Sequence, residues 1–471
     1  MNRSFLALAL SLAAACSPRG ETQVPPQPAA RNVVILCIDT LRTDQVGAYG
    51  QRRDTTPNID RLAQRGALFK LAMAHSNWTV PATASLLTSL YPSEHGAGLE
   101  GAVRKLGNDP PNQLRSGTRT LGDILHDAGF HTGLFSANPY LYGRFKRGFD
   151  AAEVDRKNAT ALTDAALTWL EGASSGPFFL YMQYMDLHQP IEPPEPYFSY
   201  FKVAEGGERG KQHTDWSYGR QTDLEDLEFR RFRAHRLALY DGALRYVDAE
   251  IGRLLNRLEE LGIAGQTLLV VTSDHGEEFW DHAAIEHQLG GDPRGLWGIG
   301  HGHSMFQELL WVPLIFYGPG VGEARTVGCL TRHVDVLPTV IELLGLAPPE
   351  AIRGQSLVPL LRPGRGRADC EPLALVAESP AYGPNSKAVV WNDHKLILRQ
   401  DGVKLLYDLA HDAGETTDLS RSNPELMSQL QRVLGRELLN AKPQGDSQPL
   451  DFDAETREQL KSLGYIQGDG G

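Results

Sequence analysis

The stretch that decides the fold is RNVVILCIDT, residues 31–40. Its apolar side chains follow one another almost without interruption, and the run ends in Asp39. A continuous apolar run of this length is typical of a strand buried on both faces of a parallel sheet. A second segment, QTLLVVTSDHGEEF at 266–279, repeats the pattern and contains Asp274 and His275. Both runs therefore predict central strands that carry polar residues at their carboxyl ends.

Further apolar runs alternate with amphipathic segments along the chain. More strands are expected at TGLFSAN (132–138), PFFLYMQYMDLH (177–188) and WVPLIFYGPG (311–320). The segment TLGDILHDAGF at 120–130 predicts a helix, and apolar residues spaced by three or four from Leu237 to Leu261 predict another that stops at Gly262. This alternation predicts an α/β fold with a doubly wound, mostly parallel sheet flanked by helices. In such folds, sites form beyond the carboxyl ends of the strands.

The length of the chain indicates two structural units. A chain of 471 residues is longer than one hydrophobic core usually covers, so we expect a large domain and a smaller one. We place the α/β domain at residues 32–365 and a smaller C-terminal α+β subdomain at residues 366–471. Within the latter, KAVVWNDHKLILRQDGVKLLYDL at 387–409 predicts antiparallel strands with a turn at Asp401. A polar helix is expected from about Pro424.

The N-terminus has the pattern of an export signal. A basic residue precedes the apolar stretch 5–12, and small residues follow up to Cys16. The apolar stretch is too short to span a bilayer. Residues 1–16 resemble a bacterial lipoprotein signal in which Cys16 is lipidated, although Ala13 stands where such signals usually carry Leu. Ordinary signal-peptide cleavage is the alternative.

Residues 17–31 are rich in Pro and polar groups and suit a flexible tether. Together, the signal and the tether predict an exported protein. We expect it to be held to a bacterial membrane through a lipidated Cys16 and to face the periplasm or the exterior.

The charge balance argues against a nucleic-acid partner. The chain carries 46 Lys and Arg and 58 Asp and Glu residues, which gives a formal net charge of -12. No clustered basic face that would neutralise a phosphate backbone is visible, so we expect no nucleic acid among the partners.

The spacing of the cysteines indicates neither a zinc knuckle nor a redox-active dithiol. They stand at positions 16, 37, 329 and 370 and form no closely spaced pair, so a disulfide framework is not expected. Cys37 lies inside the first apolar run and is interpreted as a small core residue.

Three polar residues at predicted strand ends suit a divalent cation. Asp39, Asp274 and His275 supply two carboxylates and one imidazole, which are ligands of hard and borderline metals. A fourth candidate is Thr79, in NWTVPATASLLTSLYP at 77–92. In the simplest interpretation, Thr79 only caps a helix. If that helix starts near the same sheet edge, backbone amides and the helix dipole favour negative charge beside the hydroxyl.

Several segments together resemble the sulfatase family of the alkaline phosphatase superfamily. They are NVVILCIDTLRTDQVGAYG, TTPNIDRLAQRGALF, WTVPATASLLTSLYPSEHG, DHGEEF and HGHSMFQELLWVPLIF. The likeness runs from about residue 32 to the end of the chain, with YMDLHQP at 184–190 and LKSLGYI at 460–466 among the supporting pieces. The order and spacing of these segments make the resemblance strong.

The resemblance implies a metal-dependent site in which a nucleophile attacks a sulfate or phosphate ester and forms a covalent intermediate. The matching metal-ligand positions are Asp39, Thr79, Asp274 and His275, and Thr79 also matches the nucleophile. His188 matches a residue that touches substrate oxygens or protonates the leaving group. His301 or His303 falls where the family places a cationic contact to the anion, and the spacing leaves both as catalytic candidates.

The departures from the family pattern exclude one mechanism and favour another. Sulfatases carry Cys or Ser at the nucleophile position and an Arg four positions later, whereas this chain has Thr79 and Thr83. A secondary alcohol cannot be oxidised to an aldehyde, so formylglycine is excluded at Thr79. The adjacent Asp pair of the family is reduced to Asp39-Thr40. These residues resemble instead the Thr-dependent branch, which includes phosphoethanolamine and glycerol-phosphate transferases and nucleotide phosphodiesterases.

This resemblance implies one divalent metal ion, with zinc or manganese favoured and calcium as a further option. A second metal with Asp186, His188 and either His301 or His303 as ligands is the less favoured alternative.

We therefore expect an exported hydrolase or transferase that cleaves a phosphate ester, lipid-linked or glycan-linked esters being candidates, through a covalent Thr79 intermediate. A sulfatase without formylglycine and an inactive binding protein are the alternatives, the latter because of Thr40 and Thr83. An acidic segment after the second strand is expected to be a solvated loop. It contains Glu277, Glu278, Asp281, His282, Glu286 and His287.

Overall fold

The computed structural model describes residues 29–99, 103–105, 110–201, 218–362 and 370–462. The predicted signal, Cys16 and most of the tether lie outside the described residues. Within the described ranges, none of the helices combines the length and the apolar character needed to span a bilayer.

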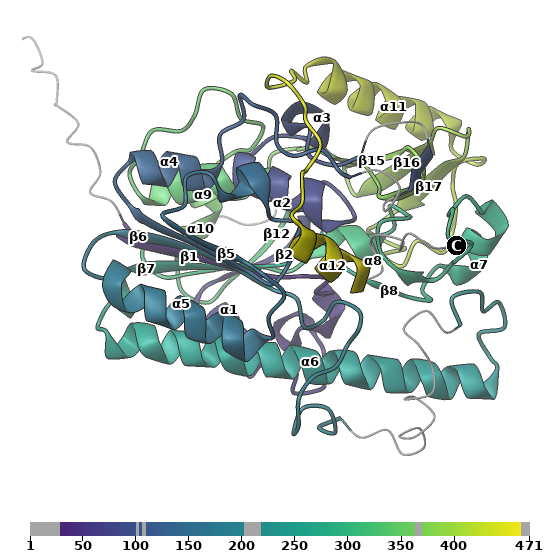
Figure 1. Cartoon of the computed structure of the whole chain (residues 1–471). Helices are drawn as coiled ribbons and strands as arrows, with labels where there is room; N and C mark the ends of the chain where they lie inside the picture. The colour runs from purple at the N-terminus through teal and green to yellow at the C-terminus, as the bar shows by residue number, and fades with distance from the viewer. Residues whose placement is uncertain (1–28, 100–102, 106–109, 202–217, 363–369, 463–471) are drawn as a thin grey trace, which may run out of the picture.

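A nine-stranded mixed sheet forms the centre of the molecule (Figure 1). Its hydrogen-bonded order is β10 (Trp311–Val312), β2 (Ala67–Met73), β11 (Leu314–Tyr317), β7 (Thr267–Thr272), β1 (Asn32–Ile38), β6 (Phe178–Tyr184), β4 (His131–Ser136) and β5 (Ala151–Val154), and β12 (Arg325–Arg332) pairs with β2. The strands from β7 to β5 are all parallel, whereas β11 runs antiparallel to both of its neighbours. The predicted mostly parallel α/β sheet is confirmed.

Helices cover both faces of this sheet, as Figure 1 shows. One face is covered by α1 (Pro57–Arg65), α5 (Ala159–Ala173) and α6 (Leu227–Glu260), and the other by α2 (Thr79–Thr88), α4 (Leu121–Asp127) and α9 (Val336–Leu343). Because helices lie on both sides, every side chain of β1, β6 and β7 is buried. Helix α6 begins about ten residues before the predicted start, where the Asp226 carboxylate accepts a hydrogen bond from the Phe229 amide at 2.8 Å.

Short elements fill the connections between these layers. The remaining α-helices there are α3 (Pro92–His95), α7 (Ala283–Leu289), α8 (Gln307–Leu310) and α10 (Val358–Leu361). The short strands are β3 (Val103–Lys105), β8 (Glu278–Phe279), β9 (Ile299–Gly300) and β14 (Tyr382–Pro384). Turns of 3-10 helix occur at Thr43–Gln45, Gly47–Tyr49, Gly143–Lys146, Ala264–Gln266 and His333–Asp335.

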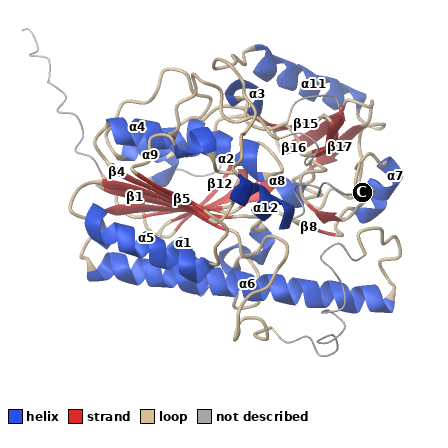
Figure 2. Ribbon diagram, viewed as in Figure 1, coloured by secondary structure: helices blue, strands red, loops and turns tan. Residues whose placement is uncertain are grey.

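A second, antiparallel sheet lies at the C-terminal side of the molecule (Figure 2). It consists of β13 (Leu375–Glu378), β15 (Ser386–Trp391), β16 (His394–Arg399) and β17 (Lys404–Asp408), followed by α11 (Pro424–Leu439) and α12 (Ala454–Ser462). Side chains alternate between its faces, so Val389 packs with Leu430 of α11 while Val390 packs with Phe306 beside the main sheet. The predicted antiparallel strands and the helix that starts at Pro424 are present.

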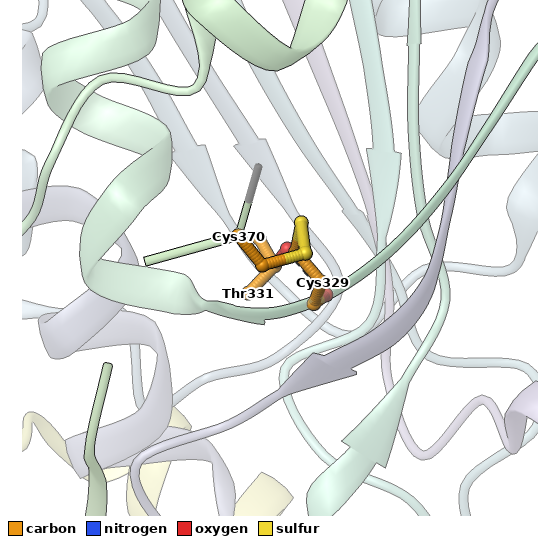
Figure 3. Close-up of a disulfide and its surroundings, with 3 residues drawn as sticks. All are labelled: Cys329, Thr331 and Cys370. Atoms are coloured by element: carbon orange, nitrogen blue, oxygen red, sulfur yellow. Dashed lines mark hydrogen bonds between the residues drawn. A yellow bond between two sulfur atoms is a disulfide. The ribbon is translucent and has the colours of Figure 1, made fainter. Parts of the chain in front are cut away.

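The prediction that the cysteines form no disulfide was wrong for one pair. Cys329 and Cys370 are joined by a disulfide across a sequence separation of 41 residues (Figure 3). Cys329 lies in β12, and Cys370 lies just before β13, so the bond ties the main sheet to the start of the smaller one. A spacing this long gives no sign in the sequence that the two residues meet. Cys37 is a buried free thiol, as predicted.

Candidate active site

The ends of two neighbouring strands bring three predicted metal ligands together. Strands β1 and β7 are parallel and paired in register up to Cys37 and Thr272, so the residues that follow them emerge at the same sheet edge. Asp39 follows β1, and Asp274 with His275 follows β7. All three side chains are fully buried. Their ligand atoms lie within 4.8 Å of one another.

Thr79 approaches this cluster from the start of α2. Its hydroxyl donates to Asp39 Oδ2 at 3.4 Å and lies 3.5 Å from His275 Nε2. The predicted capping role of Thr79 was wrong, because the N-cap position belongs to Trp78 and Thr79 is the first residue of the helix. The hydroxyl is therefore directed at the cluster and not at a backbone amide of its own helix.

Two amide side chains that the sequence analysis missed complete the polar contacts of the cluster. Asn138 Nδ2 donates to Asp39 Oδ2 at 2.7 Å and to Thr79 Oγ1 at 3.1 Å. Gln183 Nε2 donates at 3.1 Å to both Asp39 Oδ2 and Asp274 Oδ2. Asn138 follows β4, and Gln183 lies inside the otherwise apolar β6. A polar residue within such a strand is the signal that could have indicated Gln183.

The imidazole of His275 is oriented as a metal ligand. Its Nδ1 lies 2.8 Å from the carbonyl of Gly276, to which it donates, so the lone pair is on Nε2. That nitrogen lies 3.6 Å from Asp274 Oδ2 and 3.9 Å from Asp39 Oδ1. The ligand-bearing atoms of the three residues thus face one common point.

The buried negative charge of the cluster favours binding of a cation. Burial, together with the neighbouring Asp274 carboxylate, raises the pKa of Asp39 to about 7. Burial also raises the pKa of Asp274 to about 7. Asp39 Oδ1 is buried and has no hydrogen-bond partner among the described residues. Two buried carboxylates with an orphaned oxygen and a facing imidazole fit a divalent metal, and this donor set suits zinc or manganese.

Of the two candidate histidines in HGH, His301 is the one whose ring contacts the cluster. Its ring centroid lies 4.5 Å from that of His275 and 5.0 Å from that of His188. His301 Nδ1 lies 3.3 Å from both carboxylate oxygens of Glu277. His303 instead contacts Glu278 at 2.8 Å and lies 3.5 Å from an Arg294 nitrogen.

Burial favours the neutral form of the two histidines beside the cluster. Burial lowers the pKa of His188 to about 3, and burial holds the pKa of His301 well below its usual range. His188 Nδ1 lies 2.7 Å from the Gln189 carbonyl, to which it donates, so its Nε2 is left as an acceptor.

The predicted solvated acidic loop is wrong for most of its members. Glu277 and Glu278 are fully buried, and His282 and Glu286 are buried too, whereas Asp281 and His287 are exposed. These buried groups pair with one another and with neighbouring elements. Glu286 and Glu278 both contact His303, and His282 contacts Glu308 at 2.7 Å. Sequence alone did not show that other segments cover this loop.

The positions that depart from the family pattern lie beside the cluster, and of these only the backbone amide of Thr40 contacts it, donating to Asp274 Oδ1 at 3.3 Å. The Thr40 hydroxyl donates to the backbone carbonyl of Asp39, and Thr83 is buried within α2. Asp186 accepts a hydrogen bond from the Ala159 amide at 3.0 Å. Among the described residues, the groups of His, Asp and Glu close enough to share an ion include no set with Asp186 or His188.

Comparisons with known proteins give the family of this chain. The family model described as Sulfatase matches residues 31–346. The chain is 28% identical over 422 residues to the multifunctional alkaline phosphatase superfamily protein PehA of Trinickia caryophylli, covering 71% of this chain and 78% of that protein. It is 24% identical to a Delta 4,5-hexuronate-2-O-sulfatase of Bacteroides thetaiotaomicron, covering 97% of each.

A solved structure with a similar fold is the phosphonate monoester hydrolase of Silicibacter pomeroyi. The TM-score is 0.67 at 20% sequence identity, and the match covers 90% of this chain and all of that chain. The fold and the relatives together define a hydrolase of sulfuric or phosphoric esters. This chain belongs to the Sulfatase family within the alkaline phosphatase superfamily.

Proposed function

We propose that the protein is an exported, metal-dependent hydrolase or transferase that cleaves a phosphate or sulfate ester through a covalent intermediate on Thr79. The observation that carries this proposal is the position of the Thr79 hydroxyl, 3.4 Å from Asp39 Oδ2 and 3.5 Å from His275 Nε2. An alcohol held against a carboxylate and an imidazole in a buried site is a candidate nucleophile.

The residues of the cluster fit one divalent cation, with zinc or manganese favoured. Asp39, Asp274, His275 and the hydroxyl of Thr79 would hold it. Bound there, the cation supplies the positive charge that favours the Thr79 alkoxide over the hydroxyl. The helix dipole of α2 alone contributes only about 0.3–1 kcal/mol, which is too little to ionise an alcohol near neutral pH.

Asn138 is positioned to stabilise the attacking oxygen. Its amide donates to Thr79 Oγ1, while the Thr79 hydroxyl donates to Asp39 Oδ2. When the hydroxyl loses its proton, the amide still donates to the negatively charged oxygen. Asn138 thus holds the Thr79 oxygen in place and lowers the free energy of its charged form.

In the first step, attack of Thr79 on the ester, the histidines beside the cluster transfer the proton. The Thr79 oxygen forms a bond to phosphorus or sulfur as the bond to the leaving-group oxygen breaks. Thr79 gives up one proton, and the leaving oxygen takes up one. His188 and His301 are the imidazoles beside this site, and because burial holds their pKa values low, a proton taken up by either ring passes readily to the leaving oxygen. Glu277 orients His301 as a carboxylate orients a general base.

The second step restores Thr79. A water that attacks the covalent intermediate gives hydrolysis, and a bound alcohol gives transfer. In both cases the attacking oxygen loses a proton to the same imidazoles. The threonine hydroxyl regains one when the bond to phosphorus or sulfur breaks.

The charge around the cluster favours an ester with a single negative charge. The hydrogen bonds and ion pairs of Asp39, Thr79, Asp274 and His275 include none with a Lys or Arg of the described ranges. A phosphate monoester dianion would therefore gain less here than a sulfate monoester or a phosphodiester. The relatives named as a sulfatase and as a phosphonate monoester hydrolase act on esters of this charge class.

Export and membrane anchoring remain part of the proposal. The Cys329–Cys370 disulfide supports an oxidising compartment, because such bonds are rare in cytosolic proteins. The lipid anchor would be attached at Cys16, outside the described residues. The domain boundaries at residues 32–365 and 366–471 are also part of the proposal, supported by the end of the main sheet at Arg332 and the start of the second sheet at Leu375.

Substitution of the nucleophile tests the proposed activity. Thr79→Ser retains an alcohol in the same place and should keep turnover within about tenfold of the parent, whereas Thr79→Ala should lose at least about 10³-fold. The assay uses 4-nitrophenyl sulfate, bis(4-nitrophenyl) phosphate and 4-nitrophenyl phosphate with added zinc or manganese. Equal rates for the two variants would show that Thr79 is a bystander, and a parent protein without turnover would favour the alternative of an inactive binding protein.

A further inference from the structure

A single side chain, Gln183, donates hydrogen bonds to both carboxylates of the metal-ligand cluster. It lies on β6 in register with Cys37 of β1, two residues before Asp39 on the neighbouring strand. Its Nε2 donates at 3.1 Å to Asp39 Oδ2 and at 3.1 Å to Asp274 Oδ2. Because a terminal amide nitrogen carries two N–H groups, each carboxylate receives one of them.

Tyr181, two residues earlier on the same face of β6, fixes the orientation of this amide. Its hydroxyl donates to Gln183 Oε1 at 2.9 Å, and both side chains are fully buried. Reversing the amide would turn Oε1 toward two carboxylates and the N–H groups toward the Tyr181 hydroxyl. Gln183 is therefore held in the orientation that gives its N–H groups to Asp39 and Asp274.

The hydrogen bonds of Asp39 divide its two oxygens between different roles. Oδ2 accepts from Gln183 at 3.1 Å, from Asn138 at 2.7 Å and from Thr79 at 3.4 Å. Oδ1 is buried, has no hydrogen-bond partner among the described residues and lies 3.9 Å from His275 Nε2. Asp39 therefore offers one oxygen, Oδ1, to an ion.

Asp274 is divided in a similar way. Its Oδ1 accepts from the backbone amides of His275 at 2.9 Å and of Thr40 at 3.3 Å. Its Oδ2 accepts from Gln183 and lies 3.6 Å from His275 Nε2. A carboxylate oxygen has a further lone pair, and the N–H group of Gln183 fixes the direction in which that lone pair points. Asp274 therefore also offers one oxygen, Oδ2, to an ion.

We propose that Gln183 is a positioning residue for the metal: by holding each carboxylate so that it offers one oxygen, Gln183 favours zinc over calcium. Zinc in proteins usually takes about four ligands, whereas calcium takes roughly six to eight oxygens and often both oxygens of one carboxylate. The cluster supplies two carboxylate oxygens, one imidazole and the Thr79 hydroxyl. The inference rests on the proposed function, because it assigns how the same metal site selects its ion.

The test measures the metal affinity of the full-length protein after its metal has been removed. Gln183→Met keeps the length of the side chain and removes both donors. Competition with a chelating dye gives the Kd for zinc, and titration calorimetry gives the Kd for calcium. In the variant, the Kd for zinc should rise about 10- to 100-fold, as is typical when a residue that orients a metal ligand is lost, and the Kd for calcium should change less than about threefold.

Tyr181→Phe tests the same role without replacing the amide, since it removes only the hydroxyl that orients Gln183. It should raise the Kd for zinc by a smaller factor than Gln183→Met. The matched control is Asn32→Leu. Asn32 is buried at the opposite end of β1, where its amide donates to Thr267 Oγ1 at 3.3 Å. This change should lower the melting temperature and leave both Kd values unchanged.

Two results would overturn the role of Gln183. One is a Kd for zinc that stays at the parent value in Gln183→Met or, if that variant does not fold, in Tyr181→Phe. The other is an equal rise in the Kd values for zinc and calcium, because such a rise would reflect a general loss of the site.

Failure of the proposed activity gives a different pattern, in which the parent protein turns over no ester. The Kd comparison does not depend on turnover, so a parent protein that binds zinc still decides the role of Gln183. A parent protein that binds no zinc overturns both the metal site and the role of Gln183.

Discussion

Asn138 links the nucleophile to a metal ligand through one amide group. Its Nδ2 donates at 2.7 Å to Asp39 and at 3.1 Å to Thr79. Because Thr79 approaches the carboxylate only at 3.4 Å, this amide also fixes the distance at which the two oxygens face each other. Its contribution is expected mainly in the reaction step, when charge develops on Thr79.

We therefore predict that Asn138→Ala lowers kcat about 100-fold, because it removes a preorganised donor to the attacking oxygen. Metal content, measured on the purified variant, should stay the same, since Asp39 keeps its contact to Gln183. Asn440→Ala, on an exposed residue, is the control. A variant with full activity would show that the amide does not act on the nucleophile.

At the scale of elements, His282 joins the loop after β7 to α8 by an ion pair and to the C-terminal sheet region by a hydrogen bond. His282 Nδ1 lies 2.7 Å from Glu308 before β10, and its Nε2 lies 3.1 Å from the carbonyl of Gly414 after β17. Burial lowers the pKa of His282, but the carboxylates of Glu308, Glu415 and Glu278 outweigh burial and raise the pKa to about 9. The charged ring therefore stabilises the folded protein.

This ion pair predicts a pH-dependent stability. A raised pKa means that the stabilisation is fully present below the unfolded value near 6.5 and is lost as the pH rises through about 9. Between pH 6.5 and 9.5, the free energy of unfolding of the parent relative to His282→Gln should shrink by on the order of 2 kcal/mol. Urea unfolding at a series of pH values measures this, with the exposed His287→Gln as control. A constant difference across the range would contradict the assigned charge.

The elements that the sequence predicted are those with uniform burial. Strands β1, β6 and β7 are buried along their whole length, so their apolar runs are visible in the sequence. Strand β2 was missed because Lys70 interrupts it on an exposed position, and β12 alternates between covered and partly exposed residues. These two strands form because of their tertiary contacts, and the pattern of apolar residues in their own sequence does not predict them.

At the scale of the whole molecule, the site residues that could be predicted from the sequence are those that follow neighbouring parallel strands and therefore lie at one edge of the sheet. Asp39, Asp274 and His275 follow parallel neighbours, and the rule for such sheets brings them together. Their geometry agrees with that prediction, although their roles stay predictions. The pairing of Glu277 with His301 depends on how distant loops cover the sheet edge, which no local pattern shows.

The same whole-molecule contacts decide between residues that sequence spacing left open. His301 and His303 are two residues apart. The ring of His301 contacts that of His275, whereas His303 pairs with Glu278 and Glu286. The Cys329–Cys370 disulfide also depends on such contacts. Its two cysteines meet because β12 lies beside the start of the second sheet.

The central claim is that the four side chains Asp39, Thr79, Asp274 and His275 hold one metal ion and that the threonine carries the covalent intermediate. The most direct measurement is rapid quenching of the metal-loaded enzyme during turnover of bis(4-nitrophenyl) phosphate or 4-nitrophenyl sulfate, followed by mass mapping of the modified peptide. We predict one 4-nitrophenyl-phosphoryl group on Thr79 with the diester, or one sulfuryl group with the sulfate ester, and no adduct in Thr79→Ala. Steady turnover with no adduct, or with an adduct on a different residue, would contradict it.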